Sequence, residues 1–273
     1  MPNIRKNQEK AQFVIVMSAL ACALLGITGC HTNAPTDMAA VDRGDENVSK
    51  AKIAEAEPLY SGREDLAKAR VAVAVLRQAR TADYGNYEAA WKLARAEYYL
   101  AQHTDSEDER SDLFREGIQS GKAAVQLQPN KPDGHFWLGA NYGGDAEHST
   151  LAGLANVEDI RREMEEVLKL DEGYQSGSAY LGLGQLYLRA PRALGGDNAK
   201  AISYLEKGLK FGPDNAVLHA RLAEAYAAVN RDADARKQIE IVASLAPDPK
   251  FVAEHKQALA ETRKLQQKLD AKL

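Results

Sequence analysis

Small and hydrophobic residues recur between residues 60 and 250 in a pattern that returns several times. The clearest copy is residues 216–249. Apolar residues three and four apart indicate two amphipathic helices. The positions that define this copy are two apolar stripes and a closing proline: Leu222, Ala223, Tyr226, Ala235, Ile239, Val242 and Pro247. Small residues let two antiparallel helices approach, and a proline ends the second because it cannot continue a helix.

The same order of residues appears three more times upstream. The markers of these copies are Leu93, Ala94, Ala124 and Pro129; Leu138, Gly139, Tyr142 and residues 167–172; and Leu183, Gly184, Tyr187, Ala201, Leu205, Gly208 and Pro213. Ala72, Leu76 and Ala79 mark the second helix of a further unit. A helix pair repeating about every 34 residues resembles the tetratricopeptide repeat (TPR). The chain is therefore expected to be all-α, a TPR-like right-handed α-solenoid of antiparallel helix pairs.

These repeats define the expected organisation of the chain. The helical domain is expected over residues 56–273. The expected units and the C-terminal capping helix cover residues 87–131, 132–174, 177–215, 216–249 and 250–271. The polar face of the last helix suits a cap, because the end of a repeat array must cover its final apolar surface.

The first three units are longer than a standard repeat. From the small residue of the first helix to the closing position, the last unit takes 24 residues, as a TPR does. The preceding units take 35, 33 and 29 residues in chain order. Since the flanking markers keep their spacing, the added residues lie at the turn between the two helices of each unit. They either form a binding edge or add helical turns for packing.

The amino terminus has the pattern of a secretory signal. A basic start is followed by an uncharged apolar run over residues 11–26 and then by small residues, as in signal peptides. The run ends in Ile27-Thr28-Gly29-Cys30, which resembles the lipobox of bacterial lipoproteins. The sequence therefore predicts a lipoprotein signal peptide over residues 1–29 and a lipid on Cys30. The alternative is an uncleaved signal anchor.

A lipid also explains the cysteine count. Of the two cysteines, Cys22 lies within the signal, so Cys30 has no partner for a disulfide. Residues 30–55 are polar, without aromatic residues, and are expected to form a flexible tether. The residue directly after Cys30 is His31 and not aspartate, which favours sorting of the protein to the outer membrane. We expect a lipid-anchored protein of the bacterial cell envelope, facing the periplasm.

One segment carries a more specific resemblance. Tyr187 is followed by Ala190-Pro191-Arg192-Ala193-Leu194-Gly195-Gly196-Asp197 and an alanine-rich helix. Over residues 60–250 the chain resembles the periplasmic T-component family of TRAP-type solute transporters. The resemblance implies a lipoprotein scaffold that works with a TRAP substrate-binding protein. In the turn itself, two glycines permit unusual backbone conformations, and Asp197 is expected to cap the next helix.

Candidate binding residues follow from the helix positions. In a TPR stack the first helix of each unit lines the concave groove, and arginine can hold a carboxylate with two hydrogen bonds. The ligand- or partner-binding candidates are Trp91, Arg95, Tyr98, Tyr99, Phe136, Trp137, Asn141, Gln185, Arg189, Arg221 and Glu224. Some of these aromatic residues instead suit the core between repeats, and both interpretations remain open.

Other chemistry finds little support in the sequence. The net charge of −4 argues against nucleic acid. The six histidines have no helical metal spacing, so no metal site and no cofactor are expected. The acidic run over residues 105–109 suits the first turn of a helix. Without a nucleophile motif, an enzyme is not expected. We expect a scaffold for protein–protein interaction or, alternatively, an accessory small-ligand-binding component of a TRAP-type uptake system.

Overall fold

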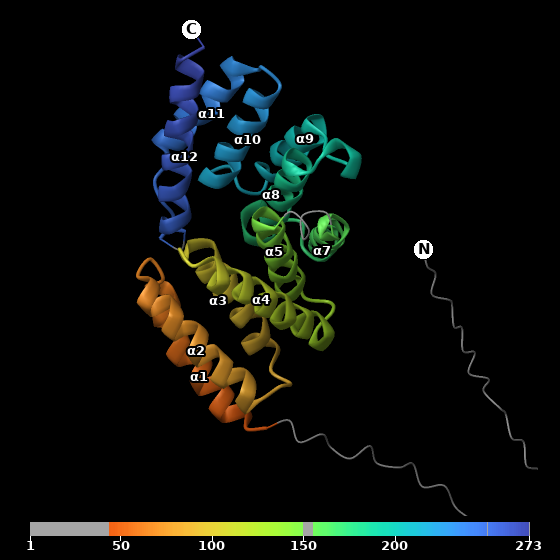
Figure 1. Cartoon of the computed structure of the whole chain (residues 1–273), viewed down its shortest axis with the longest axis vertical. Coiled ribbons are helices and arrows are strands. Elements are labelled where there is room, and N and C mark those ends of the chain that lie inside the picture. The colour runs from red at the N-terminus through yellow and green to blue at the C-terminus, as the bar shows by residue number, and fades with distance from the viewer. Residues whose placement is uncertain (1–43, 150–154, 250, 273) are drawn as a thin grey trace, which may run out of the picture. The chain divides into compact units, whose positions relative to one another are not determined.

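The regular structure of the chain is helical. The computed structural model describes residues 44–149, 155–249 and 251–272, and in these ranges it contains eleven α-helices and one 3-10 turn (Figure 1). The helices belong to one compact unit, residues 42–273. The predicted signal peptide, Cys30 and the tether as far as residue 43 lie outside the described residues.

Successive helices pair and pack against their neighbours along the chain. The pairs are α1 (Glu46–Ser61) with α2 (Leu66–Ala82), α3 (Tyr87–His103) with α4 (Glu107–Leu127), α5 (Pro132–His148) with α7 (Val157–Leu170), α8 (Tyr174–Arg189) with α9 (Asn198–Gly208), and α10 (Ala216–Ala228) with α11 (Asp232–Ser244). Helix α12 (Val252–Asp270) packs on α10 and α11. The all-α array of helix pairs expected from the sequence is confirmed.

The helical region begins earlier than expected. Residues 46–55, which the sequence analysis places in a flexible tether, form most of α1. Asp45 caps this helix by accepting the amide hydrogens of the second and third helical residues. Ile53 and Ala56 are buried one turn apart. With so few large apolar residues, the helix leaves a weak hydrophobic pattern, and it depends on α2 for its stability.

Side-chain caps set the start of many helices. The capping residues, each accepting at least one backbone N–H, are Asp45, Asp65, Asn86, Ser106, Asp197 and Asn215. The acidic run at residues 105–109 lies across the first turn of α4, as expected. Asp197 caps α9 and accepts from the amides of Ala199 and Lys200 at 2.9 and 3.1 Å. Gly195 has φ +92°, which confirms the need for glycine in this turn.

The lengths of the helices account for one of the three insertions. Helices α3 and α4 have 17 and 21 residues and are joined by residues 104–106 alone. The added residues in this unit are therefore helical turns. In the α8–α9 unit the connection over residues 190–197 contains the 3-10 turn η1 (Arg192–Leu194). The α5–α7 connection includes residues 150–154, which lie outside the described part.

Glycines allow the helices to approach closely. A Cβ on Gly121 of α4 would lie 2.8 Å from the backbone Cα of Leu138 in α5. A Cβ on Gly184 of α8 would lie 2.5 Å from the side chain of Leu205 in α9. Both distances are too short for carbon atoms in contact. The expected role of small residues at the helix contacts is thus seen both within and between units.

Two glycine substitutions in neighbouring helices distinguish the effect of close helix packing from that of helix propensity. Gly121→Ala should lower the free energy of unfolding by about 1–3 kcal/mol, because backbone atoms must move apart. Gly143→Ala in α5 introduces a methyl group with no atom within 4 Å, and should stabilise by about 1 kcal/mol through helix propensity alone. Urea denaturation measures both values. An equal stabilisation by the two substitutions would contradict the close contact at Gly121.

Candidate interaction surface

The first helices of the successive pairs lie next to one another and form one surface. Helix α1 contacts α3, and the series continues through α5, α8 and α10 to α12. We call the surface made by these six helices the first-helix face. All the binding candidates from the sequence lie on α3, α5, α8 and α10. The stacking of first helices therefore places residues from distant parts of the sequence on the same surface.

An aromatic and arginine cluster occupies one end of this face. Two guanidinium groups flank the ring of Tyr60 in α1: that of Arg95 lies 3.9 Å from the ring centroid and that of Arg63 lies 4.8 Å away. Arg95 also lies 5.1 Å from the ring of Trp91, and 3.6 Å separates it from the carboxylate of Glu57. Stacked cations of this kind contribute about 0.5–2 kcal/mol each. The cluster therefore places Trp91 and Arg95 beside each other, and their role in binding stays a prediction.

Tyr98 of α3 packs against the next helix pair. Its ring lies 5.9 Å from that of Trp137 in α5. Burial raises the pKa of Tyr98, the negative charge of Glu147 raises it further, and the positive charge of Arg221 in α10 acts in the opposite direction. Glu254 in α12 also contributes. The contact with Trp137 shows that Tyr98 joins α3 to the first helix of the next pair.

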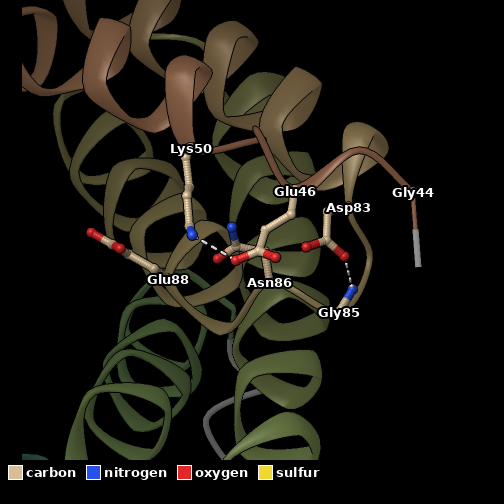
Figure 2. Close-up of a pocket in the computed structure, with 7 residues that line it drawn as sticks. All are labelled: Gly44, Glu46, Lys50, Asp83, Gly85, Asn86 and Glu88. Carbon is tan, nitrogen blue, oxygen red and sulfur yellow. Dashed lines mark hydrogen bonds and ion pairs between the residues drawn. The ribbon is translucent and has the colours of Figure 1, made fainter. Parts of the chain in front are cut away.

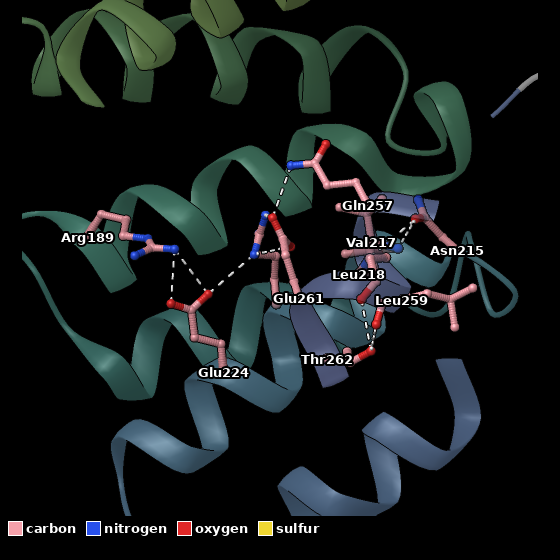
Figure 3. Close-up of polar contacts among 11 residues, drawn as sticks. Arg189, Asn215, Val217, Leu218, Glu224, Gln257, Leu259, Glu261 and Thr262 are labelled. Atoms are coloured by element: carbon pink, nitrogen blue, oxygen red, sulfur yellow. Dashed lines mark hydrogen bonds and ion pairs between the residues drawn. The ribbon is translucent and has the colours of Figure 1, made fainter. Parts of the chain in front are cut away.

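Ion pairs join the last three helices of the face (Figure 3). Arg189 of α8 lies 2.9 Å from Glu224 of α10. On the same helix Arg221 lies 2.7 Å from Glu261 of α12 and 3.5 Å from Glu224. Gln257 donates to Glu261 at 3.0 Å. Three of the predicted site residues are therefore brought together, and each already has an intramolecular partner.

Several other candidates lie inside the array rather than on its surface. Asn141 is fully buried, and its amide group donates to the carbonyl oxygens of Ala94 at 3.0 Å and Trp137 at 2.7 Å. Its two N–H donors thereby join α3 to α5, while its oxygen Oδ1 is buried without a hydrogen-bond donor among the described residues. Tyr99 is 7% exposed and belongs to the core of the first two pairs. Phe136 and Gln185 are partly buried.

Sequence reasoning missed three residues of this surface. Tyr60 and Arg63 belong to α1 and the turn after it, where no first helix was expected. Glu254 lies in the capping helix, whose contact with Arg63 joins positions 191 residues apart. The cation–aromatic spacing of Tyr60 and Arg63 is the one local signal that could have indicated the first two.

A separate polar depression lies where the start of α1 meets the turn between α2 and α3 (Figure 2). It is lined by Gly44, Glu46, Lys50, Asp83, Gly85, Asn86 and Glu88. Its carboxylates have partners: Glu46 lies 2.6 Å from Lys50, Glu88 lies 2.6 Å from Lys92, and Asp83 accepts from the amide of Gly85 at 2.7 Å. Among the described residues, no three His, Cys, Asp or Glu side chains gather closely enough to hold a metal ion.

A buried carboxyl group lies behind the face. Glu97 of α3 is 1% exposed and accepts from the hydroxyl of Ser120 in α4 at 2.8 Å. Burial raises its pKa from 4.5 to about 8, while Ser120 and Arg77 act in the opposite direction. The cost of burying the charged form exceeds the effect of both partners. Ionisation of Glu97 consequently destabilises the folded state.

This predicts a pH dependence that a single substitution removes. Because the folded state binds the proton more tightly than the unfolded state, this group's contribution to stability is complete below pH 4.5. It falls by about 1.4 kcal/mol per pH unit as the pH rises toward 8. Glu97→Gln keeps an acceptor for Ser120 and has no charge. Its free energy of unfolding should therefore exceed that of the wild type by an amount that grows from pH 4.5 to pH 8. Urea denaturation at successive pH values tests this.

The matched control uses the same arginine. Glu116 also pairs with Arg77, yet its side chain is 46% exposed. We expect Glu116→Gln to change the pH profile of stability much less than Glu97→Gln does, because an exposed pair contributes little and Glu116 is a lesser cause of the raised pKa of Glu97 than burial. A constant difference between Glu97→Gln and wild type from pH 5 to pH 8 would contradict the assigned cause.

Comparison with known proteins gives two family matches. Residues 52–184 match the model for regulator of microtubule dynamics protein 1-3. Residues 194–261 match a tetratricopeptide repeat model. Neither is the T-component family that the sequence resembles. A search of curated proteins finds no match.

Solved structures resemble the chain in fold. The thermophilic TPR protein TTC0263 of Thermus thermophilus matches with a TM-score of 0.58 and 20% identity, over 78% of this chain and 99% of its own. MamA protein matches with a TM-score of 0.46 and 18% identity, over 77% and 95% of the two chains. No helix in the described part of the chain is both long and apolar enough to cross a bilayer. The chain therefore has a TPR-like fold of paired helices, and its residues 194–261 match the TPR family.

Proposed function

We propose that the chain is a lipid-anchored TPR scaffold of the bacterial cell envelope, which faces the periplasm and binds a protein partner on its first-helix face. The TPR fold supports protein partners in general. The lipobox-like residues 27–30 and the unpaired Cys30 support the anchor and the location. One partner of this kind is the periplasmic substrate-binding protein of a TRAP-type transporter, which the T-component resemblance implies.

The observation that carries this proposal is a set of buried donors on the face. The Nε groups of Arg95 and Arg221 and the indole Nε1 of Trp137 are buried, and none has an acceptor among the described residues. Buried N–H groups in proteins are nearly always paired. Because these atoms expose almost no surface, a partner would reach them when neighbouring side chains move aside, and its carbonyl or carboxylate oxygens would then satisfy them. Aromatic residues with arginine are typical of strong interface contacts.

The test is capture of a partner by matched variants of the full chain. Chemical crosslinking in intact cells, followed by recovery of the tagged chain from the envelope, should yield a partner with the wild type. The double substitution Trp91→Ala with Arg95→Ala should lose at least about 90% of it, since central aromatic and arginine contacts carry about 2 kcal/mol or more. In the same preparation, Cys30→Ser should move the chain from the membrane to the soluble fraction.

A second cation–aromatic pair provides the control. Arg80 lies 5.6 Å from the ring of Tyr84, which is 67% exposed and lies in the α2–α3 turn. Tyr84→Ala with Arg80→Ala removes the same kinds of group away from the face, and should leave capture unchanged. Equal loss with both double variants, or no partner with the wild type, would contradict the proposal.

The second candidate function is an accessory component that binds a small ligand for TRAP-type uptake. The observation that favours it is the contact of Arg63 in the α1–α2 turn with Glu254 of α12, which bounds the first-helix face where the two ends of the array meet. A face bounded on several sides suits a compact ligand better than a long peptide. Arginine donors without acceptors would then hold the carboxylate of an organic acid.

Thermal unfolding with a panel of organic acids tests this candidate. A ligand at 100 times its dissociation constant stabilises the folded state by about 2.7 kcal/mol, which raises the melting temperature by roughly 5–10 °C for a domain of this size. The shift should disappear in Arg95→Ala and persist in Arg80→Ala. No shift with any acid, or a shift retained in Arg95→Ala, would count against ligand binding at this face.

A further inference from the structure

The two ends of the helical array meet through their side chains. Arg63, in the turn between α1 and α2, donates from Nη2 to both carboxylate oxygens of Glu254 in α12, at 2.8 and 3.1 Å. Beside it, the ammonium group of Lys256 lies 2.7 Å from Glu64. In Figure 1 the first turn of α12 accordingly approaches the α1–α2 turn. These pairs connect residues about 190 positions apart.

Such a contact is unusual for this architecture. In a repeat array each unit normally contacts its neighbours alone, and the principal helix contacts of this chain follow that rule. No large hydrophobic cluster of the described residues spans the two ends: the cores of the first pairs and of α12 are separate clusters. The ends are therefore held by charge rather than by a shared core.

The two pairs differ in strength. The side chain of Arg63 is 10% exposed and that of Glu254 is 34% exposed, whereas Lys256 and Glu64 are 63% and 51% exposed. Arg63 is also held in place by the ring of Tyr60 and by that of Tyr99, 5.1 Å away. A shielded, preordered arginine loses less entropy on pairing than a mobile surface lysine. Most of the attraction thus comes from Arg63 and Glu254.

The contact also bounds the first-helix face. Arg63 and Arg95 flank the same tyrosine ring, and Glu254 influences the pKa of Tyr98. Separation of α12 from the α1–α2 turn would break ion pairs and leave the helix pairs intact, because the hydrophobic clusters do not cross this contact. The cost of opening is then small compared with the cost of unfolding a unit.

We propose that Arg63–Glu254, supported by Glu64–Lys256, is a latch that joins the ends of the array and limits access to the first-helix face. When the pairs are closed, the access of solutes to the face is restricted. When the pairs separate, the array opens at this point and the face is reached from solution. The latch stands on its own contacts, and its role in admitting a protein partner rests on the proposed function.

The two tryptophans of the chain provide a direct probe. Trp91 and Trp137 both lie on the first-helix face, and Trp137 is 9% exposed. Acrylamide quenching of their fluorescence in the full chain measures access without any partner. We expect Arg63→Glu and Glu254→Arg each to raise the quenching constant about twofold, because the open state would then dominate. The double variant, which exchanges the two charges, should return it to the wild-type value.

Salt and a distant charge reversal complete the experiment. In the wild type, sodium chloride at about 1 M, where the screening length falls to about 3 Å, should increase quenching less than the single charge reversals do, because Arg63 is largely shielded from solvent. Lys169→Glu reverses a charge that pairs with Glu166 on the exposed surface of α7, and should leave quenching unchanged. Far-UV circular dichroism must show the same helix content in every variant compared, and a variant that unfolds is replaced by the milder Glu254→Gln.

Two results would overturn the latch: single variants that quench like the wild type, or a charge exchange that does not restore the closed value. Either outcome leaves the scaffold proposal standing, since no partner takes part in the measurement. Conversely, if quenching changes as expected but the chain captures no partner, the proposed function is contradicted and the latch is not.

Discussion

The structure depends on close contact between helices that cannot bury their apolar faces alone. At Gly121 and Gly184 the approach leaves no room for a Cβ, so packing between large side chains and a facing glycine sets the distance between neighbouring helices. The pairing of one unit therefore fixes where the next unit must lie. Hydrophobic clusters that run from pair to pair follow from this arrangement, as expected for a repeat array in which each unit stabilises its neighbour.

The candidate surface is a consequence of the same stacking. Because first helices lie next to first helices, Tyr60 of α1 meets Arg95 of α3, and Arg221 of α10 meets Glu261 of α12. Polar and aromatic groups that are far apart in sequence thereby form one surface, while Asn141 behind it joins two units through buried hydrogen bonds. Recognition and packing share the same helices, so a change at the face is also expected to affect stability.

The sequence predicted those parts of the structure that repeat. Leucine and a small residue recur in all four units, followed by tyrosine at a fixed spacing in three of them, because each unit solves the same packing problem. Asp197 could be assigned as a cap from its local context. Other features had no such signal. Gln175 and Ser176 adopt positive φ without being glycine, and α1 carries few large apolar residues. Arg63 and Glu254 are paired by the path of the whole array. A local sequence pattern cannot predict this contact, because its position depends on the packing angles of all the helices between the two residues.

The central claim is that helix pairs packed on their neighbours form an array whose two ends are also joined to each other. Native-state hydrogen exchange of the full chain, followed over low concentrations of urea, tests this most directly. If the ends are joined, the ion pair stabilises both α1 and the first half of α12 against local unfolding, so Arg63→Glu lowers hydrogen-exchange protection in both segments. Independent fraying of α1 and α12 in the wild type, with no effect of the substitution, would contradict the account.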